Sequence, residues 1–278
     1  MKKTKVKIPA KINLTLDVFQ GDNNFHNIES LVASINLFDA ITLTKRKDNK
    51  VTFTNDGLDF FENDKDNNAV KCAKKVMEKY SLSGVDIKIE RGIPIGAGLG
   101  SSSADIAGVL NAMQKLYGLE DLSPIASTLG SDVTYMMNGG FAVLSGKGDN
   151  VEKVNCNKRF YLVLMTASSG ISAGASYKEF DRLGKESACA TKKAKDYLNS
   201  GKYDEFINSL SNDLYLPSKN LVPEIEENIN TLSSFGKAVM TGSGSCTYLI
   251  FENKKERNYA YKKLKAKFNE KIIKANII

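Results

Sequence analysis

A chain of 278 residues can bury one large core or two modest ones, and its 42% hydrophobic and 26% charged residues are those of an ordinary globular protein. Residues 1–7 alternate lysine with small or apolar side chains and lack the apolar run of a signal peptide. No stretch approaches the length of a transmembrane helix. These features predict a cytoplasmic protein with no membrane partner.

The formal net charge of +7 comes largely from lysines near the C-terminus. There Ala260, Leu264 and Phe268 are spaced as one apolar stripe of a helix, with lysines on its other faces. This pattern is more typical of a solvated surface helix than of a nucleic-acid-binding one, so we expect no nucleic-acid partner. A modest positive field also suits a polyanionic nucleotide substrate.

Cysteine and histidine usage excludes several kinds of site. Cys72, Cys156, Cys189 and Cys246 are widely scattered, which predicts free buried thiols and neither disulfides nor a zinc site. His26 is the only histidine, which excludes a histidine-rich metal site and makes Ser-His-Asp hydrolysis a strained assignment.

The N-terminal half mixes predicted strands with predicted helices. Alternating hydrophobicity over residues 3–18 predicts two strands or one long bent strand, with Pro9 at a bulge or an edge. Further predicted strands cover residues 31–37, 40–44, 51–54, 85–90 and 139–144, predicted helices cover 69–80, 106–117 and 123–129, and residues 56–68 form a predicted loop.

A composition shift at residues 155–159 predicts a domain boundary, giving domains 1–157 and 158–278. After it we expect strands at residues 160–165, 237–240, 246–251 and 271–278, helices from about 176 to 234, and the basic helix before the last strand. The mixture of strands and helices with antiparallel-style connections predicts an α+β fold and not a doubly wound parallel sheet.

A loop rich in glycine and serine, residues 93–105, lies between the strand at 85–90 and the helix that follows. Its glycines leave backbone N–H groups free and allow close approach, and the helix N-terminus adds partial positive charge, so the loop suits a phosphate. An ordinary turn with a serine helix cap explains the same residues equally well.

Several phosphate-binding families do not fit this loop. The chain has no G-x-x-x-x-G-K-[ST] motif, so it is not a P-loop NTPase. It also lacks the His-Arg-Asp and Asp-Phe-Gly motifs of protein kinases, and the loop lacks the third glycine of a dinucleotide-binding fingerprint.

Three segments in order resemble the three motifs of the GHMP kinase superfamily. They are residues 9–14 (PAKINL), residues 94–105 (PIGAGLGSSSAD) and residues 240–246 (MTGSGSC), and they span essentially the whole chain. The resemblance implies a two-domain GHMP kinase fold. Its N-terminal domain would be similar to domain 2 of ribosomal protein S5, its C-terminal domain would be ferredoxin-like, and the active site would lie between them.

Within the superfamily the chain is most similar to the kinases that phosphorylate the 2-hydroxyl of a cytidine-diphosphate-linked methylerythritol in non-mevalonate isoprenoid biosynthesis. Four segments carry this similarity: residues 10–18, the Phe25-His26 pair, residues 129–133 (LGSDV) and residues 170–177. The implied small-molecule partners are ATP and a cytidine-diphosphate-linked polyol, and the implied assembly is a monomer or a homodimer.

The resemblance also implies roles for individual residues. Asp132 matches the catalytic base of the family, and Lys11 matches the catalytic lysine that would hold Asp132 ionised and steady the acceptor oxygen and γ-phosphate. Mg²⁺ would bridge the β- and γ-phosphates, with Ser102, Ser103 and Asp132 as candidate ligands. The implied ATP-binding residues are Pro94, Ile95, Gly96, Ala97, Gly98, Leu99, Gly100, Ser101, Ser102 and Ser103.

The acceptor would be held through its cytosine. Phe25 and Tyr177 would sandwich the base, and His26 would hydrogen-bond the pyrimidine edge. Asn13 would hydrogen-bond in the same pocket. The glycine turn of the third motif, with Gly242 and Ser243, completes the implied substrate site.

Departures from the family pattern keep other functions open. Serines 101 and 102 replace glycines, a version nearer to homoserine or mevalonate kinases, and Phe25 and Thr134 replace a tyrosine and a proline. A small-alcohol kinase of that type, or a non-catalytic nucleotide-binding relative, are the alternatives. Without the resemblance, Lys11 reads as a solvated strand residue and Asp132 as a helix cap.

Overall fold

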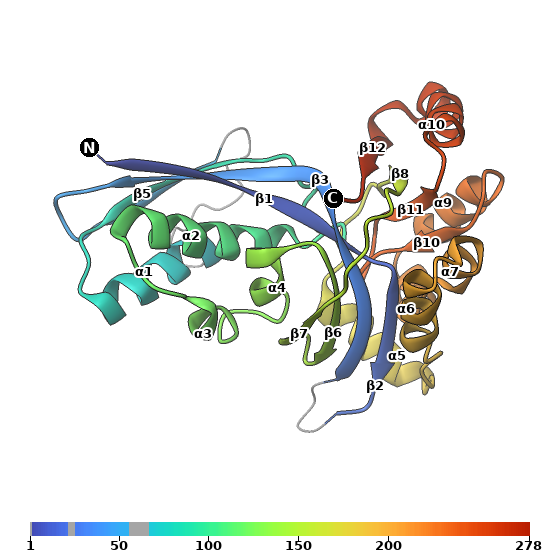
Figure 1. Ribbon diagram of the computed structural model, residues 1–278, viewed down its shortest axis with the longest axis horizontal. Coiled ribbons are helices and arrows are strands. Elements are labelled where there is room, and N and C mark those ends of the chain that lie inside the picture. The colour runs from blue at the N-terminus through green and yellow to red at the C-terminus, as the bar shows by residue number, and fades with distance from the viewer. Residues whose placement is uncertain (1, 22–25, 56–66) are drawn as a thin grey trace. The chain divides into compact units, whose positions relative to one another are not determined.

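The computed structural model describes residues 2–21, 26–55 and 67–278 (Figure 1). The described chain forms two compact units. Unit 1 comprises the described parts of Met1–Ala10, Leu37–Pro94 and Gly100–Asn138, and unit 2 comprises Lys11–Asn36, Ile95–Leu99 and Gly139–Ile278. Two long strands, β1 (Lys3–Asn13) and β3 (Asn27–Lys45), continue from one unit into the other.

Unit 1 is a small sheet covered by helices. Strand β5 (Val85–Glu90) pairs antiparallel with residues 40–45 of β3 and parallel with β4 (Val51–Asn55). Two helices, α1 (Asn68–Tyr80) and α2 (Ser101–Tyr117), lie side by side (Figure 1). Two short helices, α3 (Ser123–Ala126) and α4 (Val133–Asn138), follow.

Local sequence explains where α1 and α2 begin and end. The Asn67 side chain accepts hydrogen bonds from the backbone N–H groups of Ala69 and Val70, which caps α1. Gly118 ends α2 in the left-handed conformation that glycine adopts without strain. Gly108 lies against the side chain of Ile41, and a Cβ at this position would approach it to 2.4 Å, so α2 packs close to the sheet.

One half of unit 2 is an antiparallel sheet in the order β10-β11-β8-β12, formed by Ala238–Met240, Thr247–Phe251, Tyr161–Met165 and Ile272–Asn276. Helices α9 (Glu224–Ser233) and α10 (Lys254–Phe268) pack against it. The predicted stripe of α10 is confirmed, because Ala260 and Leu264 are buried in this core and Phe268 packs against it.

The other half of unit 2 surrounds the N-terminal part of β3. Strand β6 (Phe141–Gly146) pairs with β3 and with β7 (Asn150–Lys153), and β2 (Thr15–Phe19) pairs with β3 and in parallel with β9 (Ser211–Asn212). The remaining helices are α5 (Ala173–Leu183), α6 (Thr191–Asn199), α7 (Tyr203–Ser209) and α8 (Tyr215–Leu221), and a 3₁₀ turn (Asn269–Lys271) precedes β12.

The predicted α+β organisation and most predicted elements are confirmed. Residues 31–37 and 40–44 are extended as predicted, and both belong to one strand, β3, which passes through them without a break. Residues 56–66 of the predicted loop lie outside the described residues. The predicted domain boundary near residue 157 stays a prediction. Within the described part of the chain, no helix is long and apolar enough to span a membrane.

Candidate active site

The glycine loop, residues 94–100, enters α2 without a side-chain cap. Gly96, Gly98 and Gly100 have φ of 67°, 73° and 81°, a region that L side chains rarely adopt. Gly100 occupies the N-cap position of α2, and glycine has no side chain to accept from the first turn of the helix. The first-turn N–H groups and the helix dipole therefore suit an anion, and phosphate binding at this loop stays a prediction.

In unit 2, residues 95–99 of the loop interlock with the glycine turn of the third motif. A Cβ on Gly98 would lie 2.2 Å from the carbonyl oxygen of Thr241, and a Cβ on Gly242 would lie 2.8 Å from that of Gly98. The Cys246 N–H donates to the Ala97 carbonyl at 3.2 Å. Only glycine allows this approach, so second and third motifs form one backbone assembly.

The first motif joins the same assembly. The Lys11 N–H donates to the Leu99 carbonyl at 3.0 Å. The Asn13 N–H donates to Thr241 Oγ1 at 2.9 Å, and the Tyr248 hydroxyl donates to the Asn13 carbonyl at 2.9 Å. Unit 2 thus brings together the first motif, residues 95–99 and the third motif.

Asn13 also fixes the side chain of Lys11, which is only 5% exposed. Lys11 Nζ donates to Asn13 Oδ1 at 2.7 Å, and Asn13 Nδ2 donates to Ser30 Oγ at 2.7 Å. Ser30 in turn donates to the Thr15 carbonyl at 2.5 Å. The ammonium is therefore held by a chain of buried polar groups, and the alternative of a solvated strand lysine does not fit this burial. Ser30 was not predicted, because nothing in its local sequence distinguishes it from other strand serines.

Helix α5 connects the glycine turn to the predicted base-binding residues. Ser172 caps α5 by accepting from the Ala175 N–H, and the Ser176 hydroxyl donates to the Ser243 carbonyl at 3.3 Å. The next residue of the helix, Tyr177, stacks on His26 with ring centroids 4.9 Å apart. The structure therefore brings His26, Tyr177 and Ser243 into one unit, whereas Phe25 lies outside the described residues.

Asp132 lies in unit 1, directly before α4. It is half-buried, and its carbonyl accepts from the Met136 N–H at 2.9 Å, which places it at the start of the helix. Helix α4 was not predicted, because six residues are too few to show a helical period. The catalytic role of Asp132 stays a prediction.

The serines at the start of α2 have different surroundings. Ser102 is exposed and accepts from Asn68 Nδ2 at 2.9 Å, whereas Ser101 is buried and accepts from Arg91 Nη1 at 3.3 Å. Ser103 is half-buried.

A buried ionic cluster that was not predicted supports this end of the loop. The Arg91 guanidinium donates to Asp105 on α2 at 2.5 and 2.7 Å and to Asp39 on β3 at 3.0 Å. Asp39 also accepts from the N–H groups of Gly92 and Ile93, directly before the loop. Burial raises the pKa of Asp105 to about 6, against the opposing effect of the guanidinium. The sequence signal for this cluster is the position of Arg91, a charged residue between a predicted strand and the glycine loop.

The predicted thiol state needs one correction. Cys72 and Cys246 are buried and Cys156 is partly buried, but Cys189 is exposed, so the prediction of burial was wrong there. Cys189 lies on the exposed segment before α6, where no hydrophobic periodicity places it in a core.

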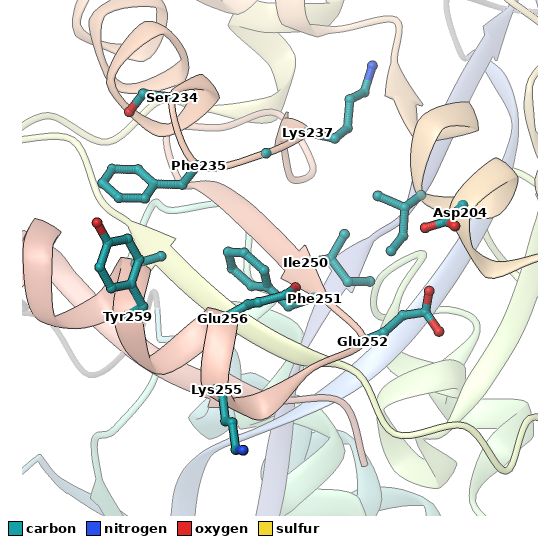
Figure 2. Close-up of a pocket in the computed structure, with 13 residues that line it drawn as sticks. Asp204, Ser234, Phe235, Lys237, Ile250, Phe251, Glu252, Lys255, Glu256 and Tyr259 are labelled. Carbon is teal, nitrogen blue, oxygen red and sulfur yellow. The ribbon is translucent and has the colours of Figure 1, made fainter.

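A large pocket lies elsewhere in unit 2 (Figure 2). It has a volume of about 620 Å³ and lies between the start of α7, the end of β11 and the first turns of α10. Phe235, Phe251 and Tyr259 line it, with charged side chains of both signs around them. None of its lining residues belongs to the predicted site, so we assign it no part in the site.

Comparisons with known proteins agree with this arrangement. The family model of the GHMP kinases N terminal domain matches residues 67–146, and that of the GHMP kinases C terminal matches residues 194–270. A Cutibacterium acnes protein named 4-diphosphocytidyl-2-C-methyl-D-erythritol kinase is 34% identical, with 88% of this chain and 85% of that protein covered. A Clostridium beijerinckii protein of the same name is 30% identical, with 98% and 100% covered.

Solved structures of kinases are also similar to this chain. A crystal structure of 4-(cytidine 5'-diphospho)-2C-methyl-D-erythritol kinase matches with a TM-score of 0.81 at 25% identity, covering 99% of each chain. A homoserine kinase from Cytophaga hutchinsonii matches with a TM-score of 0.76 at 17% identity, covering 100% of this chain and 95% of that one, which shows a shared fold. The fold and the motif assembly define a kinase of the GHMP class. Within that class, the chain belongs to the family whose curated members are named 4-diphosphocytidyl-2-C-methyl-D-erythritol kinase.

Proposed function

We propose that the protein transfers the γ-phosphoryl group of ATP to the 2-hydroxyl of 4-diphosphocytidyl-2-C-methyl-D-erythritol. The similarity to kinases of that name over nearly the whole chain carries the choice of acceptor. The glycine loop at the uncapped start of α2, where backbone N–H groups and the helix dipole favour an anion, supports the choice of donor. Both substrates are small molecules, and we propose that the enzyme acts in the cytoplasm.

In the proposed reaction the acceptor oxygen forms a bond to the γ-phosphorus while the bond from that phosphorus to the β,γ-bridging oxygen breaks, releasing ADP. Asp132 accepts the hydroxyl proton as general base. Lys11, held by Asn13, neutralises negative charge on the transferring group. The backbone N–H groups of the glycine loop and of the first turn of α2 bind the triphosphate.

We propose Mg²⁺ as the metal of the reaction. Among the described residues no group of three or more His, Cys, Asp or Glu side chains could hold a metal ion. Mg²⁺ does not require such a group, because it is commonly bound by one or two carboxylates together with substrate phosphates and water. Asp132, Ser102 and Ser103 remain the proposed ligands. Bound there, the ion supplies charge neutralisation to the β- and γ-phosphates.

Release of ADP, measured with the purified protein, tests the proposed function. We expect ADP to form with the cytidine-diphosphate-linked acceptor and Mg²⁺, and to fall to the ATP-only blank when EDTA is added. Turnover no faster than that blank would contradict the assignment. Turnover of homoserine or mevalonate, without competition by cytidine nucleotides, would establish a different acceptor.

A further inference from the structure

Three side chains on one face of helix α5 contact the ring of His26. Its ring stacks on Tyr177 at 4.9 Å with 23° between the planes, and it meets the ring of Phe180 edge-on at 6.0 Å. Its Nε2 lies 2.7 Å from Oδ1 of Asp181. These three residues are separated by three and four positions, which places them on the same face of a helix. The imidazole is 13% exposed, so it has little freedom to reorient.

The contact with Asp181 determines where the imidazole carries its proton. An ionised carboxylate can only accept hydrogen bonds, so Nε2 must be the donor in this pair. In a neutral imidazole, Nδ1 then carries a lone pair and acts as an acceptor. Asp181 itself is 56% exposed and its carboxylate is in contact with water. A hydrogen bond from one ring nitrogen to a carboxylate is a usual way in which proteins select the tautomer of a histidine.

The two pyrimidine bases respond differently to an acceptor at this position. Cytosine presents an exocyclic amino group, which donates, where uracil presents a carbonyl oxygen, which accepts. An acceptor nitrogen on the protein therefore forms a hydrogen bond with cytosine and faces a second lone pair on uracil.

We infer that Asp181 is a specificity-positioning residue. By holding His26 as the Nε2–H tautomer, it presents Nδ1 to the cytosine amino group and disfavours uridine-containing acceptors. The inference rests on the proposed function, because it takes the acceptor to be a cytidine compound. It adds to that function a residue, Asp181, that acts through His26 without touching the substrate.

Nitrogen NMR of the free protein tests the first step. The chain has a single histidine, so ¹⁵N-histidine labelling yields one pair of imidazole nitrogens without assignment ambiguity. With the imidazole in its neutral form, we expect a protonated Nε2 and an unprotonated Nδ1 in the wild type. In Asp181→Ala both tautomers become populated, and the two shifts move toward each other. A protonated Nδ1 in the wild type would overturn the inference. Nitrogen shifts in Asp181→Ala that are unchanged from those of the wild type would also overturn it.

Nucleotide binding tests the second step. We expect the wild type to bind CDP at least about tenfold more tightly than UDP by calorimetry, and Asp181→Ala to lose most of that ratio. In turnover the loss falls on KM for the acceptor and not on kcat. Asp196→Ala removes an exposed carboxylate that pairs with Lys192 on α6, and it leaves the ratio unchanged.

The two measurements separate the two ideas. If CDP binds and the acceptor is phosphorylated but the CDP-to-UDP ratio is the same in Asp181→Ala, the inference is wrong and the proposed function stands. If the acceptor is not phosphorylated in the ADP-release assay, the proposed function is wrong and the inference falls with it. If the acceptor is phosphorylated but the wild type binds CDP no more tightly than UDP, only the inference is wrong.

Discussion

The predicted catalytic residues differ in how much the structure shows of their surroundings. Lys11 and Asn13 are buried, hydrogen-bonded to each other and tied to the glycine loop and to Thr241. A buried ammonium is costly unless polar groups surround it, and the Asn13 side chain supplies such a group to Lys11. Asp132 has only its match to the family motif, so the first prediction concerns it.

Asp132→Asn tests the general base. We expect kcat to fall by a factor of about 10² to 10⁴ while the affinity for ATP changes little, because an amide cannot accept the hydroxyl proton. Steady-state kinetics and a nucleotide-binding titration measure the two quantities. Asp204→Asn, an exposed carboxylate on α7, serves as the control and should retain the wild-type rate. A kcat near the wild-type value in Asp132→Asn would mean that another group is the base.

Gly98→Ala tests the interlocked loop. Gly98 has φ of +73°, and its Cβ would meet the Thr241 carbonyl at 2.2 Å, so alanine adds a backbone clash to conformational strain. Gly118 has almost the same φ, +70°, with nothing within 4 Å of its Cβ. Gly118→Ala should therefore lose about 1–2 kcal/mol of unfolding free energy from strain alone. Gly98→Ala should lose more and raise KM for ATP.

Urea denaturation and steady-state kinetics compare these two glycine variants. Equal losses of stability in both, with an unchanged KM for ATP, would show that the close approach at Gly98 does not restrict the loop.

Cysteine alkylation tests the burial of each thiol. Burial raises the pKa of Cys72 and of Cys246 to about 12, and the thiolate is the reactive form. We expect iodoacetamide at pH 8 to label Cys189 first and Cys156 more slowly, and to reach the two buried thiols only after denaturation. Peptide mass spectrometry at timed intervals measures the order. Rapid labelling of Cys246 in the native protein would contradict its position in the core.

At the scale of elements, helix α2 and the strand before the loop are joined by Arg91. Its guanidinium bridges Asp105 on the helix and Asp39 on β3, and Asp39 accepts from the two N–H groups that lead into the loop. Both carboxylates are buried: the side chain of Asp39 is 0% exposed and that of Asp105 is 10% exposed. The cluster therefore fixes where the loop begins and where the helix starts.

Arg91→Ala should lower the free energy of unfolding by about 3–5 kcal/mol, because it leaves two buried carboxylates without their cation. Arg182→Ala removes an exposed guanidinium from its pair with Glu179 on α5, whose carboxylate keeps a hydrogen bond from Asn220, and should cost no more than about 1 kcal/mol. Chemical denaturation of both variants against the wild type measures the difference. A loss at Arg91 as small as that at Arg182 would mean that the buried cluster contributes little to stability.

Local patterns predict most elements, since alternation marks β1, β2 and β5 and helical spacing marks α1 and α2. They do not predict which distant residues meet. The position of Arg91 before the glycine loop is a signal, but it does not identify Asp39 and Asp105 as its partners, because the cluster exists only once β3, the loop and α2 are packed. Asp181 is equally undistinguished in the sequence, because its role depends on a histidine that precedes it by 155 residues.

At the scale of the whole molecule, the three sequence motifs predict the family correctly because each requires particular backbone geometry that few sequences satisfy. Gly96, Gly98 and Gly242 all adopt positive φ, as a phosphate loop and a tight turn require. The sequence could not supply the hydrogen bonds of the Asn13 backbone, because its partners Thr241 and Tyr248 are 228 and 235 positions away.

Those separations have a consequence for the synthesis of the protein. The ribosome releases Asn13 early, but its backbone N–H and carbonyl acquire their side-chain partners, Thr241 and Tyr248, only when residues 241–248 emerge. Strand β8 likewise cannot pair until its two neighbours in the sheet, β11 and β12, have been synthesised. At about 5–20 residues per second, the nascent chain spends several seconds or more with these edges unpaired. Premature termination before residue 241 would therefore release a product in which the Asn13 backbone lacks both of these partners.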